Sequence, residues 1–294
     1  MRISKLSIGL AVVWGLLAPC CVQARAVGNV SAQELVDIFK SYDYDNYLYA
    51  QKWDKSQWSY PEVLVESLPK DYLDIPSEME QRRLFMMILI PLSLKINQEI
   101  ADEREVISHL NYKNKNEALD DVDRQMIDGF ASKYDVFTRE KGKKRYDVLL
   151  EELSVRVDGV PPSILIAAAA INTNWGKAKF VPYSNNLYRQ LVWYSNQGLK
   201  PHDDENAQYR IKIFPSLYDS TGAFALEVNS SVNFETFRYM RTRLRYREKY
   251  LSGHFLVPYV IFANPLENFA GMMDYLITFY RLEDVDKKAV LGQI

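Results

Sequence analysis

The stretch "SILIAAAAINTNWGKAKF", from Ser163 to Phe180, decides the fold of this chain. Pro161 and Pro162 precede it, and proline is tolerated in the first turn of a helix because its missing N–H would have no partner there. The run that follows is apolar on every side, so we expect a helix that is buried all round. It ends in the polar triplet 172–174 and then Trp175, a pattern that predicts the floor of a binding cleft without an ionisable group.

Helical patterns surround this stretch on both sides. Ser31 with Glu34, and Ser77 with Glu80, form two capping boxes that open a short and a long helix. The long helix should extend to residue 110, and Pro91 inside it should kink or divide it, because proline cannot donate the backbone hydrogen bond. Further helices are expected over residues 118–134, 146–157, 215–237 and 264–282.

A different pattern occupies residues 183–214. Two brief alternating runs, around "LVWY" and "YRIKIF", predict a small β-hairpin lobe. The sequence therefore predicts a mainly α fold with one small β-lobe beside the buried helix. A cleft between the lobe and the helices is the expected ligand site, since pockets commonly form between such elements.

The N-terminus has the features of a secretory signal peptide over residues 1–26. Arg2 and Lys5 precede an apolar run, and "VQARA" offers small residues for cleavage after Ala24 or Ala26. An uncleaved membrane anchor is the alternative, but the run is shorter than the roughly 20 residues that a spanning helix needs. We therefore expect a periplasmic or secreted protein, and no other stretch is expected to span a membrane.

Composition argues against several chemistries. The chain has 294 residues, 48% of them hydrophobic and 25% charged, which is ordinary for a globular protein. Both cysteines lie in the expected signal, so the mature chain would have no disulfide and no thiolate metal site. The three histidines are scattered, and no glycine-rich phosphate loop is present, so we expect no cofactor and no metal. Removal of three signal cations would take the net charge from −2 to −5, which gives no electrostatic case for nucleic acid.

The segment from residue 160 to 188, "VPPSILIAAAAINTNWGKAKFVPYSNNLY", resembles the catalytic segment of bacterial Bax-type proteins and flagellar peptidoglycan glucosaminidases. That family's motif reads Ala-Ala-x-Glu-Ser-x-Trp-Gly and, after a spacer, Asn-Asn-Leu-Phe-Gly. The matching residues here are Ala169, Ala170, Trp175, Gly176, Asn185, Asn186 and Leu187. The stretch "FPSLYDSTGAFALEVNSSVNFETFR", residues 214–238, also looks like a helix of the family, and the likeness covers roughly residues 68–284.

The resemblance implies a lysozyme-like fold and cleavage of β-1,4 bonds after N-acetylglucosamine in peptidoglycan. This reaction needs a carboxylic acid that donates a proton to the glycosidic oxygen, with a pKa raised by an apolar setting. Asn172 occupies the position of the family glutamate, and an amide cannot supply that proton, which costs a factor of roughly 10²–10⁴. Thr173 replaces the family serine conservatively.

Two further departures point in the same direction. A Tyr-Ser pair of the family corresponds to Phe262 and Ala263, while Phe269 keeps the spacing to the next aromatic residue. Phe262 could stack on a sugar but could not donate or accept a hydrogen bond. The glycine that ends the second motif corresponds to Arg189, whose side chain could reshape the cleft. The resemblance thus predicts a glycosidase scaffold that has lost its normal catalysis.

Several readings of individual residues stay open. Trp175 could line the cleft or belong to the core, and Asn185 and Asn186 could contact a ligand or only shape a turn. The run "RYMRTRLRYREKY" over residues 238–250 is typical of a solvated helix face, with contact to anionic envelope groups as the alternative. The implied substrate-binding positions are Trp175, Thr173, Asn185, Asn186 and Tyr188.

The expected organisation is a signal peptide (1–26), an aromatic-rich arm (27–67), a helical region (68–157), a glucosaminidase-like domain (158–285) and a tail (286–294). The preferred function is binding of peptidoglycan, another N-acetylglucosamine glycan or an envelope protein partner. One alternative is an active hydrolase with a displaced acid, for which the candidates are Asp203, Asp204, Glu205 and Asp219. Another is a structural protein contact through the aromatic arm and the arginine-rich run.

Overall fold

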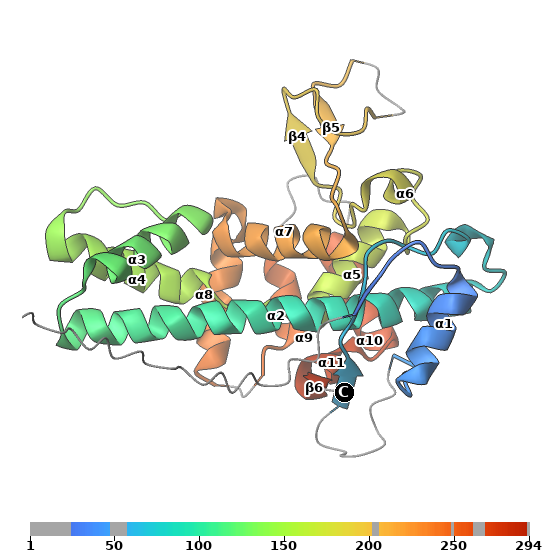
Figure 1. Ribbon diagram of the computed structural model, residues 1–294, viewed down its shortest axis with the longest axis horizontal. Helices are drawn as coiled ribbons and strands as arrows, with labels where there is room; N and C mark the ends of the chain where they lie inside the picture. Colours follow the sequence, from blue (N-terminus) through green and yellow to red (C-terminus); the bar gives the residue numbers. More distant parts are fainter. Residues whose placement is uncertain (1–24, 48–57, 202–205, 248–249, 261–267, 293–294) are drawn as a thin grey trace, which may run out of the picture.

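The computed structural model describes residues 25–47, 58–201, 206–247, 250–260 and 268–292. The predicted mainly α fold with small β parts is confirmed, and a long central helix forms its axis (Figure 1). The helices are α1 (Ala32–Ser41), α2 (Glu78–Asn116), α3 (Asp121–Lys133), α4 (Gly142–Arg156), α5 (Pro162–Thr173), α6 (Val181–Ser184), α7 (Leu217–Ser230), α8 (Glu235–Arg245), α9 (Gly253–Leu256), α10 (Phe269–Phe279) and α11 (Leu282–Lys288). Short 3-10 turns are η2 (Tyr72–Asp74), η3 (Val232–Phe234) and η4 (Val257–Tyr259).

Helix α2 begins where its cap predicted, with the Ser77 hydroxyl accepting the N–H of Glu80 at 3.3 Å. It continues for 39 residues without interruption, so Pro91 does not divide it, and the alternative outcome of a kink stays a prediction. Pro91 is buried in the core, where packing on both sides holds the helix together across the missing hydrogen bond. By length and composition α2 could cross a membrane, but 67% of its apolar window is buried inside the protein, as in a core helix.

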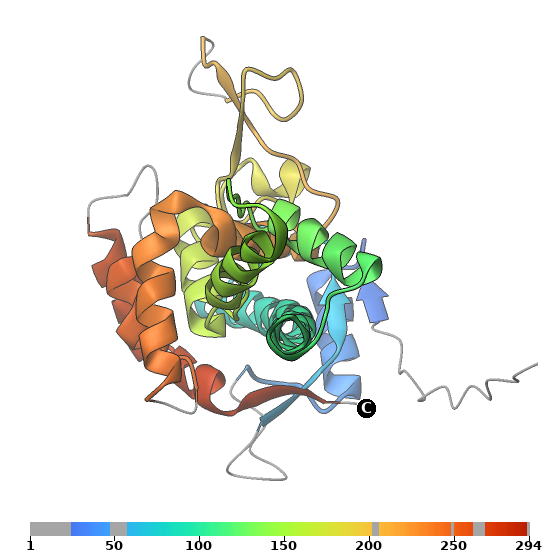
Figure 2. The ribbon, with the colours of Figure 1, turned by 90° about the vertical axis from the view of Figure 1, so that its left-hand side faces the viewer.

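Helix α5 lies in the middle of the molecule, beside α2. It packs against α2, α10 and α11, and Figure 2 shows it enclosed by the helices around it. Its residues from Ile164 to Ala170 are at most 1% exposed. The prediction of a helix buried all round is therefore confirmed. One continuous hydrophobic cluster joins this helix to the N-terminal segment and to α2.

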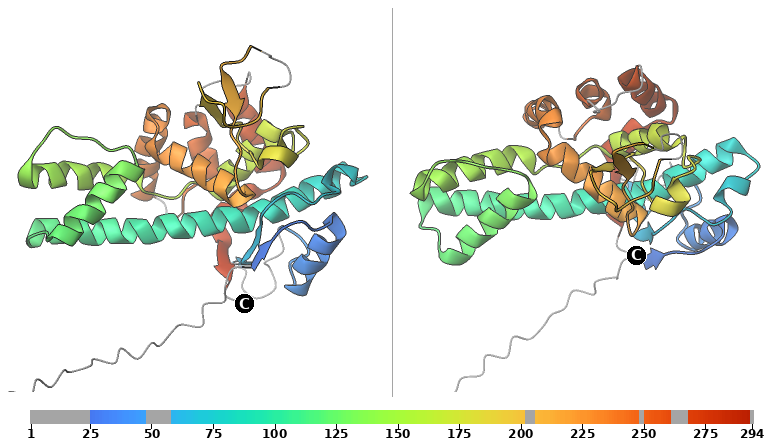
Figure 3. Two further views of the ribbon diagram at one scale, coloured as in Figure 1. Left: turned by 45° about the horizontal axis from the view of Figure 1, so that its top comes forward. Right: turned by 90° about the horizontal axis from the view of Figure 1, so that it is seen from above.

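The strands form three separate pairs. β4 (Leu191–Trp193) and β5 (Tyr209–Ile211) are antiparallel and form the predicted hairpin, which projects from the body (Figures 1 and 3). β1 (Arg25–Val27) pairs in parallel with β3 (Val63–Val65). β2 (Trp58–Pro61) pairs in parallel with β6 (Ala289–Gly292), so the segment expected as a tail returns to the N-terminal arm.

The aromatic-rich arm packs on the body of the protein. Tyr44, Trp58 and Tyr60 are each 1% exposed. The ring of Tyr44 makes edge contacts with Phe39 at 5.2 Å and with Tyr60 at 5.5 Å. These rings contribute to the core, which leaves little of them for a ligand.

Candidate functional site at the end of helix α5

The site predicted from the sequence lies at the C-terminal end of α5, where the chain reverses direction. Asn174, Trp175 and Gly176 all have positive φ, at 47°, 60° and 79°. The N–H of Trp175 donates to the carbonyl of Ala170 at 2.8 Å and closes the helix end. A Cβ on Gly176 would lie 2.7 Å from the side chain of Leu68, so the turn needs a glycine for both its backbone and its packing.

Asn172 and Thr173 supply the polar groups at this end of the helix. The Asn172 Nδ2 donates to the carbonyl of Ala168 at 2.9 Å, and its side chain is half-buried. The buried Thr173 hydroxyl donates to Ala169 at 2.6 Å and accepts the N–H of Gly176 at 2.8 Å. Both side chains thus bond to the backbone of their own segment. Neither side chain is ionisable, while a cleft at this end of α5 stays a prediction.

Trp175 follows the C-terminal end of α5 and is only 7% exposed. Its ring meets Phe85 and Tyr280 edge-on at 5.9 and 5.0 Å, and the Arg82 guanidinium lies 5.4 Å from the ring centre. The Tyr72 hydroxyl donates to the Trp175 carbonyl at 2.8 Å. These contacts give Trp175 a large packing role and leave a small part of the ring for any ligand.

Asn185 and Asn186 hold the turn that leads to the β4–β5 hairpin. Asn186 is fully buried, and its Nδ2 donates to the carbonyls of Gln190 and Lys212 at 2.8 and 2.9 Å. Its Oδ1 accepts the N–H groups of Tyr188 and Gln190 at 3.2 and 3.1 Å. Asn185 is left-handed with φ 50°, and its Nδ2 donates to the Pro215 carbonyl at 3.1 Å. Asn186 therefore has its hydrogen-bonding capacity filled by the backbone.

Tyr188 and Arg189 end the second motif in opposite ways. Tyr188 is 4% exposed and stacks on Phe224 with ring centres 4.2 Å apart, and burial raises the pKa of its phenol well above the ordinary value. Arg189 is exposed and left-handed, with φ 53°. A left-handed position explains why a glycine suits this place in the motif. The exposed Arg189 side chain gives no structural reason for the replacement.

The carboxylates considered as displaced acids are placed only in part. Asp219 lies in the first turn of α7, which Ser216 caps: the Ser216 hydroxyl accepts the Asp219 N–H at 3.1 Å and donates to the Asp219 carboxylate at 2.6 Å. Asp203, Asp204 and Glu205, like Phe262 and Ala263, lie outside the described residues. Within the described ranges, no group of three or more His, Cys, Asp and Glu side chains is arranged to hold a metal ion.

One carboxylate near the hairpin, that of Glu227, was not predicted from the sequence. Glu227 on α7 is half-buried, and its Oε2 accepts the Gln190 Nε2 at 2.9 Å, directly before β4. Glu227 follows Phe224 at helical spacing on a helix whose facing positions are apolar, and this interruption of the pattern is the signal that could have found it.

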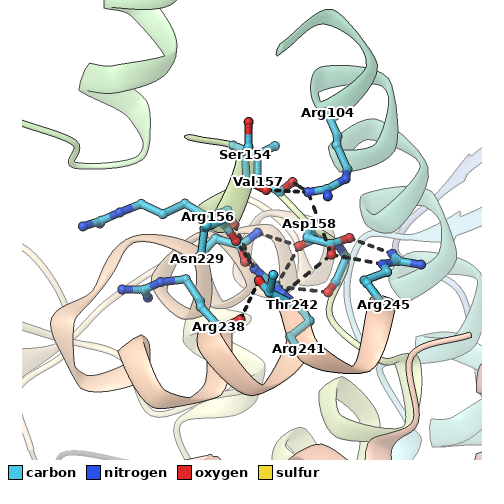
Figure 4. A network of polar contacts seen from close by, with 12 residues as sticks. Arg104, Ser154, Arg156, Val157, Asp158, Asn229, Arg238, Arg241, Thr242 and Arg245 are labelled. Atoms are coloured by element: carbon cyan, nitrogen blue, oxygen red, sulfur yellow. Dashed lines mark hydrogen bonds and ion pairs between the residues drawn. The ribbon is translucent and has the colours of Figure 1, made fainter. Parts of the chain in front are cut away.

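The arginine-rich run also differs from its prediction as a solvated face. Arg241 is fully buried, and its guanidinium donates to the carbonyl of Asp158 at 2.9 Å and to Asn229 Oδ1 at 2.7 Å. Arg245 forms two hydrogen bonds, 2.6 and 3.1 Å long, with the Asp158 carboxylate (Figure 4). Arg243 and Arg247 remain exposed, as expected for the rest of the run. The prediction fails at Arg241 and at Arg238, which is 3% exposed, because their hydrogen-bond partners lie outside α8. Arg245 is exposed, although it pairs with Asp158.

Comparison with curated proteins finds Protein bax of Escherichia coli strain K12, which is 26% identical to this chain over 197 residues. This chain is a distant relative of a Bax-type protein. The match covers 65% of this chain and 66% of that protein, slightly less than two thirds of its length. No family model matches the chain, and no solved structure matches it.

Proposed function

We propose that this chain is an exported, lysozyme-like protein that binds peptidoglycan or another N-acetylglucosamine glycan without performing normal glycosidase catalysis. The observation that carries the proposal is Asn172, an amide at the end of a fully buried helix, in the segment that resembles the family's catalytic motif. An acid at this position would have an apolar surrounding that raises its pKa, which is what a proton donor requires. Asn172 occupies this position, but its amide cannot donate a proton to the glycosidic oxygen.

Binding is supported by polar and aromatic groups that are still available. Among the described residues, the Asn172 side chain bonds only to Ala168, through one N–H, so its second N–H and its oxygen can bond a sugar hydroxyl or acetamido group. The β4–β5 hairpin presents Trp193 and Tyr194, which are 59% and 83% exposed. Large exposed aromatic side chains grouped on one element are a common mark of a binding surface.

The direct test is isothermal titration of the mature protein with chitooligosaccharides and with muropeptides. We expect measurable binding that Trp193→Ala weakens at least tenfold, which is about 1.4 kcal/mol. Phe137→Ala is the control, because Phe137 is also an exposed aromatic ring, 81% exposed against 59% for Trp193, and it lies in the α3–α4 connection. Absence of binding to every glycan tested would contradict the proposal and leave the envelope protein partner as the better account.

The alternative of an active hydrolase has a separate test. Purified protein is incubated with peptidoglycan, and the released fragments are analysed by mass spectrometry. We expect no new N-acetylglucosamine reducing ends. Cleavage that Glu227→Gln abolishes would instead identify a displaced acid at the root of the hairpin.

The variant Asn172→Glu tests whether the replacement at this one position accounts for the proposed loss of glycosidase catalysis. We expect it to restore little cleavage, because the positions of Phe262 and Arg189 also differ from the family pattern. Cleavage comparable to that of an active glucosaminidase would show that the rest of the site had stayed competent.

A further inference from the structure

A second site lies at the opposite end of α5. A cavity of about 630 Å³ opens between α2, the turn before α5, the end of α8 and the α11–β6 connection. This volume falls within the range of small-molecule pockets. Pro162, which lines the cavity, lies ten residues before Asn172 along α5, a distance of about 15 Å, so the two places are distinct.

Three cationic side chains from three elements line this cavity: Arg104, Arg245 and Lys287. Their side chains are 37%, 40% and 41% exposed, so each can be reached by solvent. Arg245 is held rigidly by its paired hydrogen bonds to the Asp158 carboxylate. Arg104 is fixed by the carbonyls of Ser154 and Val157 at 2.9 and 2.6 Å. The two guanidinium groups are therefore preorganised at the wall.

The negative charge at this place does not balance the positive charge. Three arginines lie around one carboxylate, that of Asp158, which is 4% exposed (Figure 4). They are Arg245, at 2.6 Å, and Arg104 and Arg241, each at 3.9 Å. Burial lowers the pKa of Arg241 to about 10, and its neighbouring arginines add to this effect. An additional anion would relieve the repulsion among these groups.

The remaining carboxylates nearby reduce this excess of positive charge. Glu105 lines the wall from α2, and Glu283 lies 4.0 Å from Lys287. Asp286 is buried, accepts the Ser163 and Gly253 N–H groups at 2.9 Å each, and takes the Ser163 hydroxyl at 2.6 Å. Burial raises the pKa of Asp286 to about 8, which weakens the repulsion that this carboxyl exerts on an anion near neutral pH.

The cavity also has an apolar part. Leu94, Val160, Leu251 and Val285 line it beside the cations. Pockets of this composition bind ligands that bury an apolar body while a few fixed polar groups orient one end. Arginine suits carboxylate and phosphate because its planar fork matches their oxygens.

We propose that this cavity is a binding site for a small organic anion, with a carboxylate or phosphate group held by Arg104, Arg245 and Lys287 and an apolar body packed between α2 and α11. The site is independent of the glycan-binding proposal, since it shares none of the motif residues.

The test uses phenyl phosphate and benzoate as probes on the mature protein, at constant ionic strength, by isothermal titration and thermal unfolding. We expect at least one of them to bind with a Kd of about 1 mM or tighter and to raise Tm. Inorganic phosphate should bind at least about tenfold more weakly, because it lacks the apolar body. Phenol should not bind measurably, because it lacks the charge. The comparison between the two probes tells whether the natural anionic group is a phosphate or a carboxylate.

Two variants locate the binding without removing the buried charges. Ala101→Phe fills the mouth of the cavity from an exposed position on α2, and Lys287→Gln removes the outer cation. Each should weaken binding at least about fivefold. Lys177→Gln is the control, since Lys177 is a half-buried cation at the other end of α5, paired with Glu78 at 3.1 Å. Lack of binding by both probes, equal binding of phenol, or binding unaffected by both cavity variants would overturn the proposal.

Discussion

The two ends of helix α5 handle polar groups in opposite ways. At its C-terminal end, Asn172 and Thr173 are neutral and bond to the backbone of their own helix. At its N-terminal end, Asp158 and Asp286 are buried carboxyls that bond to side chains and N–H groups from distant segments. The difference teaches that the buried charged groups beside α5 lie at its N-terminal end, whereas the family motif lies at its C-terminal end. Each prediction below alters one end and uses a matched change elsewhere.

The largest effect is expected from Asp158→Ala, which leaves the buried Arg241 without its nearby carboxylate. Breaking a buried ion pair in this way costs about 3–5 kcal/mol of the free energy of unfolding. Urea unfolding followed by circular dichroism measures the change. Asp128→Ala is the control: it removes an exposed pair with Arg145 at 2.6 Å and should cost less than about 1 kcal/mol. Equal losses in the two variants would show that burial at this end of α5 carries no special energy.

A smaller loss is expected at the other end from Gly176→Ala. The added methyl group would meet Leu68, and φ of 79° is unfavourable for alanine, so the free energy of unfolding should fall by about 1–3 kcal/mol. The matched change is Gly129→Ala within α3, where a Cβ has no neighbour within 4 Å. That variant should gain up to about 1 kcal/mol, because alanine favours a helix over glycine. A gain in both variants would contradict the tight turn after α5.

The buried carboxyls predict opposite pH dependences at one end of α5. Burial raises the pKa of Asp286 to about 8, against an ordinary value of 3.8. Between these values the native state holds a proton that the unfolded chain has released, so this group makes stability fall as pH rises, by at most about 1.4 kcal/mol per pH unit. Asp286→Asn should remove this slope in urea unfolding measured from pH 5 to pH 8, and Asp128→Asn should leave it unchanged. The same slope in Asp286→Asn and the wild type would argue against the effect.

Asp158 titrates in the other direction. Burial alone would raise its pKa, but the hydrogen bond from Arg245 and the charges of Arg241, Arg245 and Arg104 outweigh it and hold the pKa below the ordinary value. Its contribution is therefore present above pH 4 and is lost as pH falls further. The two carboxyls together favour a stability maximum on the mildly acidic side of neutrality.

The smallest effect is expected from Arg189→Gly. Relief of the left-handed backbone at φ 53° should slightly outweigh the greater freedom of glycine in the unfolded chain, for a gain of zero to about 1 kcal/mol. Arg243→Gly, at an exposed position inside α8, should instead lose about 0.5–1 kcal/mol. A loss in Arg189→Gly as large as in the control would mean that the arginine side chain stabilises the turn.

The sequence predicted the parts of the fold that have local causes. The Ser31 and Ser77 caps, the buried α5 and the β4–β5 hairpin each follow from neighbouring residues, and the structure contains all of them. The uncharged end of α5 was predictable for the same reason. Pro91 does not divide α2, because packing around this helix outweighs the local preference of proline.

The features that escaped prediction depend on partners far away in the sequence. Arg241 looks like a surface residue until Asp158 and Asn229 are placed beside it. The mainly packing contacts of Trp175 depend on Phe85 and Tyr280, which come from α2 and from beyond α10. The cavity at the start of α5 is formed by four separate parts of the chain, so no single stretch contains a signal for it.

The pairing of β2 with β6 has a consequence for the order of events during synthesis. Trp58 aligns with Ala289 and Pro61 with Gly292, so β2 pairs with a strand that is synthesised much later. Contacts between residues so far apart in sequence form late, because the loop between them must close first. While the ribosome still holds residues 289–292, β2 lacks the strand with which it pairs in the folded protein. The β2–β6 pair therefore forms only after these residues have been released.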